Sequence, residues 1–337
     1  MKQISWSVTR MSANLTKTMN GTQFVSSCFN TEAQIIAEIF AYCLVFVVSL
    51  VGNTLIGIVV YKKKALRKPI NFLIVNMAMS DLLFPIFLFP NNVIWLHTSS
   101  WVFRGLLGKA LCKLVPFFIE SSLVVSVQSL VLIAVDRFGA VFYPLRGPLI
   151  SLKLCRFLIL ATWIIAMAGW CINLFTFNLV EYSERLACVR IWSEALGKYF
   201  SFETFIVVMH VVFRYVPLIF IAIIYVSIAI KIKCQKTPGL QIVNSRERRL
   251  KRERSVLKMS VAIVSVFGIC WLPHTIGWFL ITFSSNTTMI SSCGFLYFRS
   301  VAYFLAVANC AISPCICFTF SGNYRGELKN ILSCFFC

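Results

Sequence analysis

The sequence predicts an all-α protein, a bundle of seven transmembrane helices followed by a short amphipathic eighth helix. Of its 337 residues, 59% are hydrophobic and only 13% are charged, and the mean hydropathy of +0.82 excludes an ordinary soluble domain. A bilayer core about 30 Å thick needs roughly 20 apolar residues per helix. Stretches of this size lie near residues 37–61, 70–96, 110–143, 154–178, 202–234, 255–283 and 293–320.

These stretches divide the chain into three parts. Residues 1–35 form an amino-terminal tail, residues 36–320 the seven-helix domain, and residues 321–337 an amphipathic helix with a short tail. The amino-terminal tail lacks an apolar core of signal-peptide length, so we expect the first crossing to act as an uncleaved targeting segment. Seven crossings place the two chain ends on opposite sides of the membrane.

The last part carries its apolar side chains on one helical face. They are Tyr324, Leu328, Ile331 and Leu332. We expect this helix to lie flat on the inner leaflet, in contact with membrane lipid. Cys334 and Cys337, which neighbour two phenylalanines, are candidate palmitoylation sites.

Basic residues identify the cytoplasmic face. The formal net charge of +20 would suit a nucleic-acid-binding protein, but the cations are sorted by loop. Five lie between Lys62 and Lys68, and ten lie between Lys231 and Lys258. By the positive-inside rule these loops are cytoplasmic. The sequence therefore predicts a multi-pass plasma-membrane protein with an extracellular amino terminus, a cytoplasmic carboxyl terminus and no nucleic-acid partner.

Glycosylation sequons lie on the opposite face. Asn14, Asn20 and Asn286 are each followed two residues later by threonine. A short sequon is weak evidence by itself, but all of these fall on the face that the basic residues predict to be extracellular. The sequons therefore support the same orientation.

Polar residues recur inside the apolar stretches in a fixed order. They are Asn53, Asp81, Asp136-Arg137-Phe138, Trp163, Pro217, Trp271-Leu272-Pro273 and Ser313-Pro314. Buried polar groups are costly in lipid and are therefore usually functional. Their order and spacing resemble the rhodopsin-like (class A) family of G protein-coupled receptors between residues 35 and 330.

Most of the fourteen cysteines lie within or just inside the membrane, where packing is the expected role. Those on the outer face are Cys28, Cys112, Cys188 and Cys293. The family resemblance implies a disulfide between Cys112 and Cys188, which ties the second outer loop across the ligand entrance. It also suggests a bond between Cys28 and Cys293, as in some peptide-binding members, and a free thiol is the alternative.

Asp81 is a carboxylate within an apolar stretch and needs partners there. The resemblance supplies Asn53, Ser126 and Asn309, with Ser313 beside them, as an oxygen-rich set that holds an allosteric sodium ion. The alternative is a protonated or water-bonded Asp81 without an ion, which Ser313 favours because the family usually has Asn or Asp there. No other cofactor is expected.

The resemblance also implies a two-state switch at the inner end of the third stretch. Arg137 is held at rest by Asp136 and by Glu253 of the sixth stretch, and its release opens a site for a G protein. Leu145, in the loop that follows, is expected to enter a groove of the G protein. Tyr225 corresponds to the tyrosine that meets Arg137 in active members.

A proline in the sixth stretch, Pro273, frees a backbone carbonyl and kinks the helix. In the family, residues at the positions of Trp271, Phe267 and Pro217 carry ligand binding to the inner face. Packing is the alternative for each aromatic, because the chain contains 31 phenylalanines. The spacing from Pro273 favours the switch.

Charged and aromatic residues at similar depths are expected to line one cavity. They are Glu120, His210, Arg214, Trp271, His274 and Arg299. We expect Glu120 and Arg214 to form a structural bridge, because buried charges require partners. Unpaired, they would offer a ligand one acidic and one basic contact. Ile119 stands where amine receptors have an aspartate, and the seventh stretch lacks the lysine that retinal requires.

The second outer loop resembles that of receptors for short neuropeptides, especially the neuropeptide Y, neuropeptide FF and orexin-like group. The similar residues are Cys188 to Trp192, Lys198, Tyr199 and Phe202. A hairpin of strands there would offer edges to a peptide. The resemblance implies a neuropeptide receptor that activates a heterotrimeric G protein, with arrestin as a further partner. We find no catalytic array of residues and expect no enzyme activity.

Two alternatives remain open. A small-molecule or lipid ligand is favoured if Arg214 and Arg299 bind a carboxylate. A seven-helix protein that scaffolds or scavenges without signalling is favoured by Ser313 and Cys317, which replace the asparagine and tyrosine of the family. A transporter is disfavoured because the sequence has no internal repeat and no paired broken helices.

Overall fold

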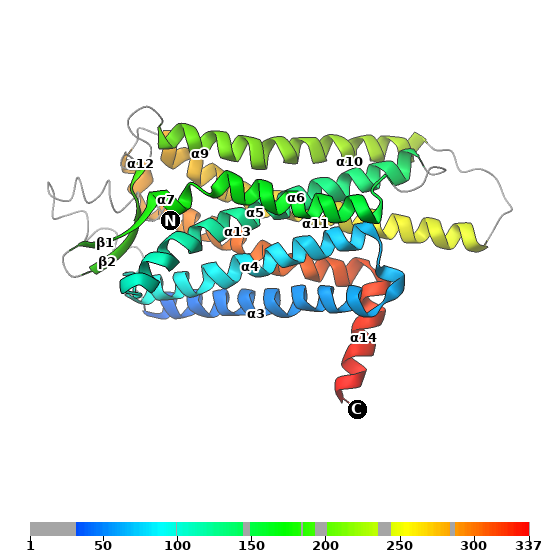
Figure 1. Cartoon of the computed structure of the whole chain (residues 1–337), viewed down its shortest axis with the longest axis horizontal. Helices are drawn as coiled ribbons and strands as arrows, with labels where there is room; N and C mark the ends of the chain where they lie inside the picture. The colour runs from blue at the N-terminus through cyan, green and yellow to red at the C-terminus, as the bar shows by residue number, and fades with distance from the viewer. Residues whose placement is uncertain are drawn as a thin grey trace.

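The protein is described by a computed structural model that covers residues 32–98, 100–143, 149–182, 185–192, 201–234, 244–283 and 287–336. Within these residues, seven helical segments are long and apolar enough to cross a membrane. They lie side by side with their long axes roughly parallel (Figure 1). The all-α fold predicted from the sequence is therefore confirmed.

The helices of the bundle begin and end as follows. They are α3 (Glu32–Lys62), α4 (Pro69–Thr98), α5 (Gly105–Phe142), α6 (Leu152–Trp170), α9 (Phe202–His210), the π-helical turn η2 (Val211–Tyr215), α10 (Val216–Cys234), α11 (Asn244–Phe283) and α13 (Cys293–Phe320). The shorter elements are the 3-10 turn η1 (Lys64–Leu66), α7 (Asn173–Thr176), β1 (Phe177–Tyr182), β2 (Arg185–Arg190), α12 (Thr287–Ser291) and α14 (Gly322–Phe336).

The sixth crossing, Ser255–Ile281, agrees with the sequence prediction, but the helix that contains it is longer. Helix α11 begins at Asn244 and extends past its neighbours at the end opposite the β-strands (Figure 1). Its basic first part contains no proline or glycine, so nothing in it interrupts the helix. The fifth crossing consists of α9, η2 and α10, and the π-helical turn was not predicted.

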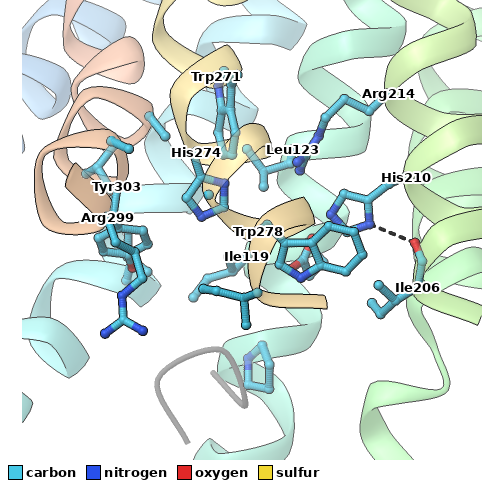
Figure 2. Close-up of a pocket in the computed structure, with 18 of the residues that line it drawn as sticks. Ile119, Leu123, Ile206, His210, Arg214, Trp271, His274, Trp278, Arg299 and Tyr303 are labelled. Carbon is cyan, nitrogen blue, oxygen red and sulfur yellow. Dashed lines mark hydrogen bonds between the residues drawn. The ribbon is translucent and has the colours of Figure 1, made fainter. Parts of the chain in front are cut away.

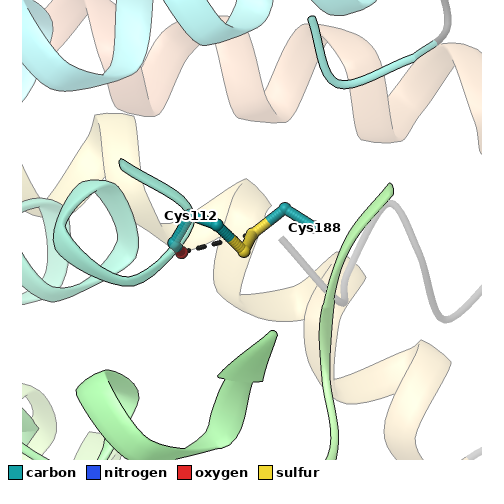
Figure 3. The surroundings of a disulfide bond; sticks show 2 residues. All are labelled: Cys112 and Cys188. Carbon is teal, nitrogen blue, oxygen red and sulfur yellow. Dashed lines mark hydrogen bonds between the residues drawn. A yellow bond between two sulfur atoms is a disulfide. The ribbon is translucent and has the colours of Figure 1, made fainter. Parts of the chain in front are cut away.

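A β-hairpin covers one end of the bundle, as predicted for the second outer loop. Strands β1 and β2 pair antiparallel, with Leu179 opposite Cys188. Cys188 forms a disulfide with Cys112 near the start of α5, with 5.5 Å between the two Cα atoms (Figure 3). The backbone N–H of Trp101 also donates to the carbonyl of Leu186, at 2.8 Å. The hairpin is therefore fixed to α5 and to the loop that precedes it.

Polar contacts connect the helices in the middle of the bundle. The amide of Asn76 in α4 donates to the Ser129 hydroxyl at 2.9 Å, and its carbonyl oxygen accepts from the Trp163 indole at 2.9 Å. In lipid such bonds matter because the surrounding hydrocarbon is as apolar as the interior and does not drive helices together. The network joins α4, α5 and α6.

Helices α3 and α13 approach each other closely. A Cβ atom added at Gly52 would lie 2.7 Å from the Pro314 side chain, so the position has no space for a larger residue. One residue further along α3, the Asn53 amide donates to the carbonyl of Cys310 at 3.0 Å. Small residues and interhelical hydrogen bonds of this kind stabilise helix packing in membranes.

The eighth helix, α14, leaves the bundle at a steep angle to the other helices (Figure 1). Its predicted apolar face does not lie entirely on lipid, since Tyr324 and Ile331 are buried against the protein. The Tyr324 hydroxyl donates to the Asn71 side chain at 3.3 Å, and burial raises the pKa of this phenol. An ion pair of 2.7 Å between Lys63 and Glu327 also fixes the helix.

Candidate functional site

A cavity of about 420 Å³ lies beneath the hairpin, between the helices. Its walls come from α4, α5, β1, β2, α9, η2, α11 and α13. This volume falls within the range of sites for small molecules and for the ends of larger ligands. The cavity is the candidate ligand site.

All six residues that the sequence analysis placed in one cavity line this one: Glu120, His210, Arg214, Trp271, His274 and Arg299. Figure 2 shows His210 and Arg214 on one side, Arg299 and Tyr303 on the other, and His274 between them. The Trp271 ring lies next to Arg214 and His274. That these residues bind a ligand stays a prediction.

The expected bridge between Glu120 and Arg214 is not formed. Within the described residues, neither side chain has an ion-pair partner, although Glu120 lies near enough to Arg214 to act on it electrostatically. Arg214 instead places its guanidinium carbon 4.6 Å from the centre of the Trp271 ring. The guanidinium therefore makes a cation–π contact in place of the predicted salt bridge.

Aromatic rings surround the histidines of the cavity. His210 shares a hydrogen bond of 2.8 Å with the Ile206 carbonyl, and its ring stacks on Trp278 with 5.0 Å between centroids. His274 meets the Trp271 ring edge-on at 5.6 Å. These contacts fix the orientation of both imidazoles within a largely apolar wall.

Arg190 of strand β2 also lines the cavity, and the sequence analysis missed it. Its guanidinium lies between the rings of Phe177 and Phe202, at 4.5 and 4.7 Å from their centroids, and donates to the Asn173 side chain at 2.9 Å. Burial lowers the pKa of Arg190 to about 10, against an opposing effect of Glu120. The sequence did contain a signal for Arg190. Residues two apart in a strand lie on the same face, so Arg190 shares the face of Cys188, which the disulfide turns toward the bundle.

Below the cavity, aromatic contacts lead toward the interior. Trp271 stacks on Phe267, with centroids 5.9 Å apart, and meets Phe84 at 6.4 Å. Pro273 lies two residues further along α11, and Pro217 follows η2 in α10. Trp271 therefore connects Arg214 in the cavity with Phe267 in the core.

Asp81 is buried and only partly satisfied. The Ser126 hydroxyl donates to one carboxylate oxygen at 3.1 Å, and Ser313 lies beside the same group. The other oxygen has no hydrogen-bond partner among the described residues. Asn53 donates to Ser49 and to α13 rather than to Asp81, and the Asn309 carbonyl accepts from Ser313 at 3.2 Å. Oxygen donors of this kind fit a hard cation, and a sodium site stays a prediction.

At the end of α5 away from the hairpin, Arg137 forms an ion pair with Asp136. The Arg137 Nε also donates to the same carboxylate, at 3.2 Å. Tyr225 of α10 packs against the core, and its hydroxyl has no hydrogen-bond partner in the part of the chain that is described. The side chain of Glu253, the second predicted partner of Arg137, lies outside the described part.

Several predicted positions lie outside the described residues: Asn14, Asn20, Cys28, Leu145, Asn286, Cys337 and the side chain of Cys334. Cys293 at the start of α13 is a disulfide cysteine, but its pairing with Cys28 stays a prediction. Glycosylation and palmitoylation likewise stay predictions.

Comparison with known proteins gives one family. The sequence model of the 7 transmembrane receptor (rhodopsin family) matches residues 52–316. The RYamide receptor of Tribolium castaneum is 27% identical over 306 residues, which cover 86% of this chain and 79% of that receptor. Neuropeptide Y receptor type 6 of Mus musculus is 27% identical over 322 residues, covering 92% and 84%. The QRFP-like peptide receptor of Branchiostoma floridae is 26% identical over 303 residues, covering 87% and 76%.

Proposed function

The chain belongs to the rhodopsin family of seven-transmembrane receptors, and on that premise we propose that it is a plasma-membrane receptor for an extracellular neuropeptide that activates a heterotrimeric G protein. The family is one of receptors, so the chain is not an enzyme. The relatives it resembles are peptide receptors by name. The observation that carries the proposal is the cavity beneath the hairpin, whose lining includes Trp271.

The peptide is proposed to enter beside the hairpin. Strands β1 and β2 leave one edge each without a partner strand among the described residues, and such edges can pair with an extended peptide. The disulfide and the buried Arg190 hold the hairpin in place above the cavity. The end of the peptide would then reach Trp271.

The proposed signal is a population shift. A ligand that displaces Trp271 changes its stacking on Phe267, and the backbone hydrogen bond that Pro273 cannot donate lets the inner half of α11 move outward. This movement favours the state in which Arg137 leaves Asp136 and contacts the G protein. An agonist that converts a mostly inactive population needs about 5.5 kcal/mol of differential affinity for the active state.

The inner face is proposed to be the one that carries the basic part of α11 and the ion pair between Lys63 and Glu327. The positive-inside rule supports this orientation. It places the sequons and the hairpin outside the cell, and α14 with its candidate palmitoylation sites on the inner leaflet, where arrestin would also bind.

The test is agonist-dependent G protein activation in cells that express the full chain, screened with a library of neuropeptides. We expect a response that Arg137→Ala abolishes. Arg156→Ala is the matched control, because Arg156 is an exposed arginine near the inner end of α6 and its removal should leave the response unchanged. A chain that reaches the surface but responds to no peptide would contradict the proposal.

A non-signalling role is the second candidate, and Cys317 is the observation that favours it. Cys317 fills the place of the family's tyrosine and is fully buried, so a tyrosine there would overpack the core. The informative variant is therefore Ser313→Asn alone. If peptide screening is silent both before and after this substitution, the scaffold or scavenger role gains support.

A further inference from the structure

Arg214 is a buried charge that faces the cavity without an anionic partner among the described residues. Its side chain is 8% exposed and comes from the π-helical turn η2. Among the described residues it has no ion-pair partner and no hydrogen-bond acceptor, and its contact is the Trp271 ring at 4.6 Å. π-Helical turns are rare and are found preferentially at functional sites. The position of this arginine therefore requires an explanation.

A cation–π contact satisfies only part of a guanidinium. The ring attracts the positive charge from one side, whereas the five N–H groups lie in the guanidinium plane and need acceptors. A buried charge without a hydrogen-bonding partner is costly. The N–H groups of Arg214 are therefore satisfied only when a hydrogen-bond acceptor enters the cavity.

The surroundings of Arg214 favour an anion as that acceptor. The Trp271 indole nitrogen and His274 Nδ1 are buried without hydrogen-bond partners in the described part of the chain. Arg190 and Arg299 also line the cavity, against the acids Glu120 and Glu203. The described lining thus has more basic than acidic groups, and Glu203 is exposed at its rim.

The negative charge of Glu120 is the feature of the cavity that opposes the binding of an anion. It lies on α5 and acts on both Arg214 and Arg190, but it pairs with neither within salt-bridge distance. Its charge therefore offsets the basic groups from a distance and leaves the donors of Arg214 open. A ligand acceptor at contact distance gains more from Arg214 than it loses to a more distant Glu120.

We propose that the ligand presents a carboxylate to Arg214, beside the face of Trp271. A planar carboxylate accepts two parallel hydrogen bonds from a guanidinium, and a carboxamide does not reproduce this pairing. This inference rests on the proposed function and specifies the ligand's chemistry. It also explains how ligand binding is transmitted to the interior. The carboxylate that binds Arg214 would lie against the ring of Trp271, which stacks on Phe267.

The first test measures binding without signalling. The full chain, purified in detergent, is titrated with N-acetylphenylalanine and with N-acetylphenylalaninamide, which differ in charge but hardly in shape, and thermal unfolding is followed. We expect the acid to bind more tightly than the amide, by roughly tenfold. Arg214→Gln should abolish this preference, and Arg214→Lys should retain part of it.

Arg185→Gln is the matched control, since it removes a positive charge from the exposed start of β2, outside the lining of the cavity. The preference for the acid should survive it. Equal binding of acid and amide by the unmodified chain would overturn the proposal even if Arg214→Gln failed to fold. A preference for the acid that persists in Arg214→Gln but is lost in Arg299→Gln would also overturn the proposal.

The second test distinguishes the sources of a carboxylate. Cells that express the chain are treated with neuropeptides prepared in pairs, with free and with amidated carboxyl ends, and with decanoate as a fatty acid. A response to the free-acid peptides identifies a peptide carboxylate, and a response to decanoate identifies a lipid one. Equal or stronger responses to the amidated peptides would overturn the proposal that the ligand presents a carboxylate. The proposed receptor function would still be supported.

Discussion

Arg137 and Arg214 are two arginines of one bundle in opposite situations. Arg137, at the end of α5 away from the hairpin, has its own carboxylate partner in Asp136. Arg214, in the cavity beneath the hairpin, has only the ring of Trp271 among the described residues. The protein supplies the partner of Arg137 and leaves the partner of Arg214 to be supplied. An internal partner suits a group that is held until activation, and an open one suits a group that binds a ligand.

Depth does not explain this difference. Arg190 and Arg214 are almost equally buried, with 7% and 8% of their surface exposed. Arg190 nevertheless has two aromatic rings and the Asn173 side chain as partners. The two arginines therefore differ in the partners that the fold provides, and removing each charge should have different consequences.

The largest effect is expected at the ion pair between Asp136 and Arg137. Asp136→Asn keeps the shape of the side chain but leaves Arg137 without its anion, which should lower the free energy of unfolding by about 3 kcal/mol. The measurement is chemical denaturation of the purified protein in detergent. The double variant Asp136→Asn/Arg137→Gln should recover much of the loss. A single variant as stable as the unmodified protein would mean that the pair contributes nothing.

A smaller effect is expected at Arg190, whose partners are two aromatic rings and the Asn173 side chain. Arg190→Gln loses two cation–π contacts and the bond to Asn173, a cost of about 2 kcal/mol. The same denaturation experiment measures it. Arg185→Gln, at the exposed start of the same strand, should be neutral. Equal effects of Arg190→Gln and Arg185→Gln would show that the partners of Arg190 do not stabilise the fold. The contrast between Arg190 and Arg214 would then be removed.

Arg214→Gln should change stability by less than about 1 kcal/mol, because the lost cation–π contact is offset by the removal of a poorly compensated charge. This result would separate Arg214 from both of the paired arginines. It is read from the same unfolding curves, in the absence of any ligand. A loss as large as that of Arg190→Gln would show that Arg214 is structural.

The smallest effect concerns the partly exposed pair between Lys63 and Glu327. The hydrogen bond from Lys63 holds the pKa of Glu327 below its ordinary value of 4.5. A lowered folded-state pKa stabilises the fold above the ordinary value, and this contribution is lost as the pH falls through the folded-state pKa. Thermal unfolding should therefore distinguish Glu327→Gln from the unmodified chain at pH 7 but not in acid. A difference that persists in acid would exclude the ion pair as its cause.

The sequence predicted most of the architecture for physical reasons. Apolar stretches of membrane length specify the crossings, and the family pattern implied the bond between Cys112 and Cys188. The cavity residues could be grouped because Glu120, His274 and Arg299 lie on helices whose depth can be counted from the membrane boundary.

The partners of these residues could not be predicted in the same way. Charge complementarity suggested a bridge between Glu120 and Arg214, but the guanidinium lies over Trp271 because side-chain direction depends on η2, for which the sequence has no recognised signal. Arg190 was missed because it reaches the cavity from strand β2 of the hairpin, whose position over the bundle cannot be counted along a membrane helix. The burial of Tyr324 depends on Asn71, which is distant in sequence and close only in the folded chain.

The π-helical turn also has a consequence for chain length. Each residue of a helix turns the chain by about 100°, so one residue more in a single turn rotates every position beyond it relative to those below. Deleting one residue between Val211 and Tyr215 would rotate α9 about its own axis and carry His210 away from the wall it now forms. Such a deletion substitutes no side chain, but it would change which side chains of α9 face the cavity and therefore which molecules the cavity accepts.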